Sequence, residues 1–91
     1  MKELVHFTAD WCNPCKRMAP IIEEFLKNNP DIHYDRVDVD VDFNKAEQNN
    51  VQSVPTFISK VNGKIYDRHS GIASKFKIES MFSGHLPKKS N

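Results

Sequence analysis

Two cysteines three positions apart are the residues of this chain with the most distinctive chemistry. They lie in the segment Trp11-Cys12-Asn13-Pro14-Cys15-Lys16, between a β-prone run at residues 4–7 and an amphipathic helical pattern. A Cys-x-x-Cys pair at a strand-to-helix junction is typical of a dithiol that cycles with a disulfide. Backbone N–H groups and the dipole at the helix start favour a thiolate, so we expect Cys12 to be the attacking nucleophile. Cys15, one turn deeper, is then the resolving thiol.

Two inert core cysteines and a metal site are the alternative interpretations. The other candidate zinc ligands with nitrogen donors are His6, His33, His69 and His85. Their spacing differs from that of zinc fingers, and structural zinc needs four ligands. A further cluster consists of Asp35, Asp38, Asp40 and Asp42. It lacks the loop pattern of calcium sites and favours a solvated strand edge, so we expect no metal.

An amphipathic helix is predicted directly after the first cysteine. The apolar residues that share one helical face are Met18, Ile21, Ile22 and Phe25. The pattern predicts a helix from residue 13 to about residue 28. Pro14 suits the first turn, whereas Pro20 lies inside the helix, where it removes a backbone hydrogen bond and should kink the axis.

The remaining elements are predicted from alternation, turn signals and helix caps. Strands are expected at 4–7, 32–41, 54–61 and 64–69, with Asn62-Gly63 as the turn of a hairpin between the last two. Asp42 or Asn44 can cap a short helix that ends near residue 49, and Ser74 can cap a last helix that ends near Gly84. The order βαβαββα predicts an α/β fold, a four-stranded mixed sheet with three helices whose first crossover is parallel and right-handed.

Size and charge exclude several classes of protein. The 91 residues, 38% of them hydrophobic, fit one domain at 1–91 with a thin core and a polar tail at 87–91. A net charge of +1 argues against a nucleic-acid partner. No apolar run approaches the length of a membrane helix, which takes about 18 residues, and no secretory signal pattern follows Met1, so we expect a cytoplasmic protein.

Several segments together resemble the thioredoxin family. The run from Phe7 to Lys16, followed by Met18-Ala19-Pro20, is similar to the thioredoxin active-site segment, and Val54-Pro55-Thr56 is similar to the cis-proline loop. The Asn62-Gly63 hairpin and Gly71 extend the match over nearly the whole chain. The resemblance implies a minimal thioredoxin fold that lacks the N-terminal strand and helix of full-length thioredoxins. It also implies a redox-active Cys12–Cys15 disulfide.

The resemblance also implies which residues bind a substrate. A cis bond before Pro55 would lie opposite the cysteines, and the backbone of Val54 would pair with the substrate chain. The alternative is that Pro55 is an ordinary proline at the start of a strand. Apart from the resemblance, the apolar side chains of Trp11 and Ile72, with Gly71 next to Ile72, could form a rim around the cysteines that receives proteins. The alternative is that the lone tryptophan beside a loop only packs against its neighbours.

The most consequential departure from the family concerns a buried acid. In thioredoxins that acid helps to move the proton of the deeper cysteine, and His6 occupies the matching position. The neighbouring lysine of the family is replaced by Arg36. Burial and Arg36 should both keep His6 neutral, and neutral imidazole can accept the proton of Cys15. The alternative is a hydrogen-bonded strand histidine with no part in catalysis.

The residues around the cysteines should tune the redox potential. Asn13 stands where thioredoxins most often have glycine, and it can donate a hydrogen bond to sulfur or point to solvent. Pro14 is the second residue between the cysteines. Lys16 and Arg17 carry charges that would help to stabilise a Cys12 thiolate.

The sequence therefore predicts a protein-disulfide reductase that binds no cofactor tightly and acts as a monomer. By resemblance, its partners are disulfide-containing proteins and an NADPH-dependent flavoprotein reductase. One alternative is a glutaredoxin-like oxidoreductase that uses glutathione, which the short chain favours and which Trp11, Pro14 and Lys16 oppose. Another alternative is an accessory subunit that uses the fold as a binding module.

Overall fold

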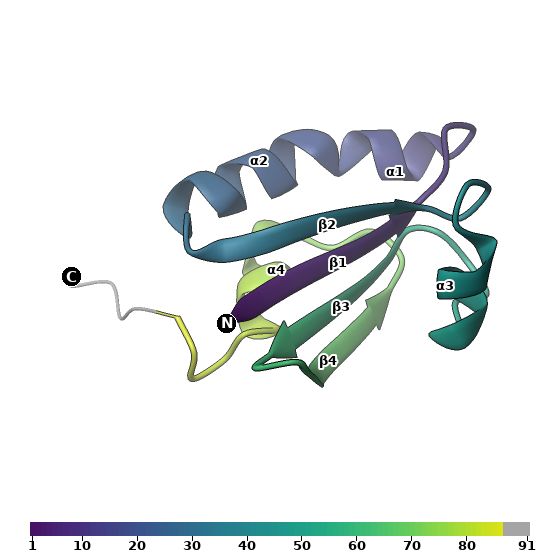
Figure 1. The fold of residues 1–91 in the computed structure, drawn as a ribbon. Coiled ribbons are helices and arrows are strands. Elements are labelled where there is room, and N and C mark those ends of the chain that lie inside the picture. Colours follow the sequence, from purple (N-terminus) through teal and green to yellow (C-terminus); the bar gives the residue numbers. More distant parts are fainter. Residues whose placement is uncertain (87–91) are drawn as a thin grey trace.

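Four strands form one mixed sheet in the computed structural model, which describes residues 1–86 (Figure 1). The strands are β1 (Lys2–Thr8), β2 (Ile32–Asp38), β3 (Thr56–Val61) and β4 (Lys64–Ser70), in the order β2-β1-β3-β4. β1 and β2 are parallel, whereas β1 with β3 and β3 with β4 are antiparallel. The predicted α/β class, mixed sheet and hairpin are confirmed. The polar tail predicted at 87–91 lies outside the described residues.

Residues 1–86 form four helices, whereas the sequence predicts three. They are α1 (Asn13–Arg17), α2 (Ala19–Asn28), α3 (Phe43–Gln48) and α4 (Lys75–Ser80). The single helix expected at 13–28 is divided at Met18, because Pro20 has no N–H to continue the hydrogen-bond ladder. α1 and α2 still run nearly in line along the sheet (Figure 1), so the expected kink is a break between two helices.

Two strands are shorter than their patterns predict, for local reasons. The chain turns after β2 because the carbonyl of Asp38 accepts hydrogen bonds from the N–H groups of Val41 and Asp42, at 3.1 and 2.8 Å. β3 begins at Thr56, directly after Pro55, because proline has no N–H to donate to a neighbouring strand. Apolar alternation cannot mark either limit.

Side-chain caps and a tight turn hold the remaining elements in place. Asp42 caps α3 by accepting the N–H of Lys45 at 3.2 Å, and Ser74 caps α4 by accepting the N–H of Lys77 at 3.0 Å. Asn62, at the hairpin turn, adopts a positive φ of 53°, a conformation that asparagine tolerates well. Of the two predicted caps for α3, the structure therefore uses Asp42.

The two faces of the sheet pack against different helices. One face carries Leu4 and Phe57 and packs against α2 and α4, while the other carries Phe7 and Ile58 and packs against α3 through Ala46. Figure 1 shows α3 beside the carboxyl ends of β1 and β2. Among residues 1–86, no helix combines the length and apolar character needed to cross a membrane.

Candidate active site

Cys12 and Cys15 form a disulfide at the start of α1. Their Cα atoms are 5.2 Å apart, and Cys12 is the N-cap of the helix, with its Sγ accepting the backbone N–H of Cys15 at 3.1 Å. Pro14 occupies the first turn, where its missing N–H has no intrahelical partner. In the reduced protein the same N–H would favour a thiolate at Cys12, since hydrogen bonds to a charged acceptor are the stronger ones.

Burial does not distinguish the two cysteines, because Cys12 is 3% exposed and Cys15 is 4% exposed. Their neighbours do distinguish them. Cys15 lines a cavity between α1, α2 and β2 that also contains His6, whereas Cys12 accepts the helix N–H group. The surroundings of the two sulfurs therefore differ although their burial is the same.

The loop before β3 meets the cysteines across the end of the sheet. Val54 packs against the cluster formed by Ala9, Cys12 and Cys15. The peptide bond to Pro55 is cis, and the Pro55 carbonyl accepts the N–H of Gly71 at 2.8 Å. Gly71 has a φ of +97°, a conformation that favours glycine. Three distant segments of the chain are thus joined at one place.

Two large apolar side chains are exposed near these segments. Trp11 is 66% exposed and Ile72 is 50% exposed. The indole Nε1 of Trp11 donates a hydrogen bond to Asp40 at 2.8 Å. Sequence reasoning missed this role of Asp40, because alternation indicated only a polar strand edge.

His6 lines the same cavity as Cys15 and is 3% exposed. It pairs in register with Arg36 on β2 and stacks on Phe57 of β3, with ring centroids 4.5 Å apart. Burial, and then the charge of Arg36, lower the pKa of His6 from 6.5 to about 4. The imidazole is therefore neutral near pH 7, as the sequence predicts.

The two ring nitrogens of His6 have unlike surroundings. Nδ1 is 2.9 Å from the hydroxyl oxygen of Tyr34, whereas Nε2 is buried and has no hydrogen-bond partner among residues 1–86. The pKa of Tyr34 is raised above its ordinary value, mainly by burial. The Tyr34 side chain is therefore a neutral phenol near pH 7. Sequence reasoning missed the contact between Tyr34 and His6, although alternation on β2 places Tyr34 on the same face as Arg36.

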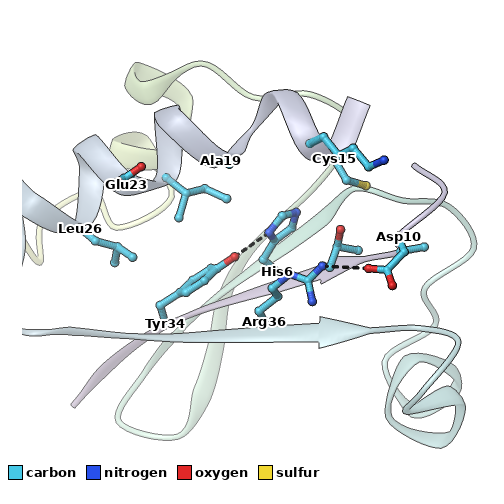
Figure 2. A pocket seen from close by; sticks show the side chains of 12 residues that line it. His6, Asp10, Cys15, Ala19, Glu23, Leu26, Tyr34 and Arg36 are labelled. Carbon is cyan, nitrogen blue, oxygen red and sulfur yellow. Dashed lines mark hydrogen bonds and ion pairs between the residues drawn. The ribbon is translucent and has the colours of Figure 1, made fainter. Parts of the chain in front are cut away.

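The cavity beside His6 has a volume of about 430 Å³ (Figure 2). Apolar side chains of α2 line one wall, and charged side chains lie at its rim. The charged or titratable lining residues are His6, Asp10, Cys15, Lys16, Glu23, Tyr34 and Arg36. Arg36 forms an ion pair with Asp10 at 3.5 Å in an exposed position, so the pair contributes little to stability.

The residues expected to tune the redox potential surround the disulfide. Asn13 is exposed, and within residues 1–86 its side chain forms no hydrogen bond to either sulfur, so the solvent-facing alternative holds. Lys16 and Arg17 are exposed on α1, and Lys16 lies at the rim of the cavity.

The aspartate cluster has protein partners. Asp35 pairs with Lys45 at 2.6 Å, and Asp38 accepts the N–H of Asp40 at 2.9 Å. Within the part of the chain that the structure describes, no group of three or more potential ligands could hold a metal ion.

Comparison with known sequences identifies the family of this site. The family model for thioredoxin matches residues 1–83. Thioredoxin from Chlamydia trachomatis is 35% identical over 82 residues, covering 90% of this chain and 80% of the relative. Thioredoxin H-type from Ricinus communis is 37% identical over 83 residues, covering 91% of this chain and 70% of the relative.

Solved structures agree with the sequence comparison. Fasciola hepatica thioredoxin is 35% identical with a TM-score of 0.84, covering 93% of this chain and 81% of that protein. The thioredoxin NaTrxh from Nicotiana alata is 34% identical with a TM-score of 0.85, covering 94% of this chain and 74% of that protein.

Proposed function

Since this chain belongs to the thioredoxin family, it is a thiol-disulfide oxidoreductase, and we propose that it reduces protein disulfides in a cycle that begins at Cys12. The observation that carries this proposal is the Cys12–Cys15 disulfide, which lies at the N-terminus of α1 and against the loop of the cis Val54–Pro55 bond.

The cycle has two thiol-disulfide exchange steps. The Cys12 thiolate attacks one sulfur of a substrate disulfide, forms a mixed disulfide, and releases the other substrate sulfur as a thiolate. Cys15 then loses its proton and attacks the Sγ of Cys12. The Cys12–Cys15 bond forms, the bond to the substrate breaks, and its electron pair leaves on the second substrate thiolate. The two protein thiols are oxidised and the substrate disulfide is reduced.

His6 is proposed as the proton acceptor for Cys15. Both residues line the same cavity, and Nε2 of His6 is buried without a partner among the described residues. A neutral imidazole has one nitrogen that can accept a proton, and burial and the charge of Arg36, which lower the pKa of His6 to about 4, favour the neutral ring near pH 7.

The substrate is proposed to bind over the rim of the disulfide. Trp11 and Ile72 are exposed there, and apolar side chains of a partner would cover them. The loop before β3 contains Val54 and Pro55, and it is joined to the loop after β4 by the hydrogen bond from Gly71 to Pro55. An extended substrate segment can pair with the backbone groups of these loops beside the cysteines.

The redox environment completes the proposal. Asn13, Pro14 and Lys16 tune the potential through their place beside the sulfurs. The electron donor is an NADPH-dependent flavoprotein reductase, and the chain itself holds no tightly bound cofactor. A dithiol recharged in this way suits the reducing cytoplasm. We also propose that residues 1–91 form one domain and act as a monomer.

The test compares electron donors in the reduction of insulin. NADPH oxidation is followed with thioredoxin reductase in one arm, and with glutathione and glutathione reductase in the other. We expect turnover with thioredoxin reductase that disappears in Cys12→Ser and is unaffected in a matched surface variant, Ser80→Ala, on α4. Turnover with glutathione alone would refute the proposed donor and favour a glutaredoxin-like activity.

A further inference from the structure

The hydrogen bond between His6 and Tyr34 allows two arrangements of protons. A neutral imidazole carries one N–H, and a phenol can donate or accept. When Nδ1–H donates to Tyr34, Nε2 is a free acceptor; when the Tyr34 hydroxyl donates to Nδ1, the proton is on Nε2. The separation of 2.9 Å between Nδ1 and the hydroxyl oxygen suits both arrangements.

The surroundings of His6 disfavour an imidazolium. Burial and Arg36 hold its pKa at about 4, so the doubly protonated ring is about a thousandfold less populated than the neutral ring near pH 7. A proton taken up at Nε2 is therefore retained only if another leaves at Nδ1. Within residues 1–86, Tyr34 is the partner of Nδ1.

The positions of the three side chains suit a relay. Figure 2 shows His6 between Tyr34 and Cys15, with one ring nitrogen turned to Tyr34 and the other on the side of the ring toward Cys15. All three line the same cavity of about 430 Å³, which has room for a bridging water. Tyr34 is partly exposed, whereas His6 is buried, so the pathway runs from the buried thiol toward the surface.

We propose that Tyr34 is a positioning residue that sets the tautomer of His6 and passes the Cys15 proton to solvent. The S–H bond of Cys15 breaks as Nε2 gains the proton, directly or through water. The Nδ1–H bond breaks as the hydroxyl oxygen of Tyr34 gains that proton, and the hydroxyl releases its own proton to water. Both side chains end neutral, and the Cys15 thiolate attacks Cys12.

Other charged residues line the same cavity, and a test of the relay must leave these residues unsubstituted. They are Asp10 from the loop after β1, Lys16 from α1, Glu23 from α2 and Arg36 from β2. β3 contributes Phe57, which does not titrate. Substitutions confined to Tyr34 and His6 leave all of these groups in place.

This inference rests on the proposed roles of Cys12 and Cys15. One assay distinguishes failure of the proton relay from failure of the proposed function. Reduced protein is mixed in a stopped-flow instrument with the aromatic disulfide dithiobisnitrobenzoate. Attack by Cys12 releases one thionitrobenzoate, and attack by Cys15 on the mixed disulfide releases the second. The first phase tests the nucleophile, and the second phase tests the proton relay. Absence of both phases in the unmodified protein would refute the proposed function itself.

The variants are Tyr34→Phe, His6→Gln and the pair together, with Tyr66→Phe as the matched control. Tyr66 lies on β4, away from the cavity, and its hydroxyl donates to the Ser83 carbonyl at 2.6 Å. We expect Tyr34→Phe to slow the second phase near pH 7 about tenfold and to leave the first phase unchanged. His6→Gln should slow the second phase at least as much as Tyr34→Phe does. The double variant should be no slower in this phase than His6→Gln alone.

The pH profile distinguishes a relay from a structural effect. At alkaline pH hydroxide removes the Cys15 proton directly, so the difference between Tyr34→Phe and Tyr66→Phe should narrow. Thermal unfolding of each oxidised variant checks that it folds. A second phase in Tyr34→Phe within about twofold of the control near pH 7, or a slowing that is equal at every pH, would overturn the relay.

Discussion

The buried His6 should make the stability of the fold depend on pH in a specific window. The pKa of His6 is about 4 in the folded protein and 6.5 when it is unperturbed. Above about pH 6.5 the ring is neutral in both states. Between the two pKa values only the unfolded chain binds the proton, so folding stability falls as the pH falls. Below about pH 4 both states are protonated and the loss is complete.

The size of the loss follows from the two pKa values. The full difference, from 6.5 to about 4, corresponds to about 3 kcal/mol, and about 2.5 kcal/mol of it is lost between about pH 7.5 and pH 4.5. Oxidised protein and oxidised His6→Gln are unfolded in urea at both pH values. The carboxylates are the same in both proteins, so their contribution to the loss of stability in acid is the same. The difference between the two losses is therefore the contribution of His6.

The control for this experiment is His33→Gln, because His33 lies exposed on β2. We expect His33→Gln to lose stability in acid as the unmodified protein does, and His6→Gln to lose about 2 to 3 kcal/mol less. An equal loss in all three proteins would refute the claim that His6 is buried as the neutral ring.

Three further substitutions test other parts of the structure. Ser74→Ala removes the cap that accepts the N–H of Lys77, and should lower the free energy of unfolding in urea by about 1 kcal/mol. Phe57→Ala leaves a cavity where a fully buried ring packs, and should lower it by about 3 to 5 kcal/mol in the same measurement. Trp11→Ala removes an exposed side chain held by Asp40, and should raise KM for insulin about tenfold, equivalent to about 1.4 kcal/mol, with a smaller change in kcat in steady-state kinetics.

Much of the fold is predictable because its signals are local. The β-prone run at residues 4–7 marks β1, the Asn62-Gly63 pair marks the hairpin, and the cysteines lie between a strand and a helix. The break at Met18 was predictable only as a kink, because Pro20 shows that a hydrogen bond is missing but not how the helix accommodates it.

The parts of the site that the sequence did not reveal depend on contacts between distant segments. The hydrogen bond from Trp11 to Asp40 and the pair of His6 with Tyr34 both join residues far apart in the chain. Alternation gives the face of a strand, but the register between β1 and β2 decides which side chains meet.

The roles of the two cysteines are tested most directly by trapping the mixed disulfide. Reduced Cys15→Ser protein is incubated with insulin, and the products are mapped by mass spectrometry after alkylation. We expect a covalent adduct through Cys12 that dithiothreitol releases, and no adduct in Cys12→Ser. An adduct formed equally well through Cys15 in Cys12→Ser, or no adduct in either variant, would contradict the assignment of Cys12 as the nucleophile.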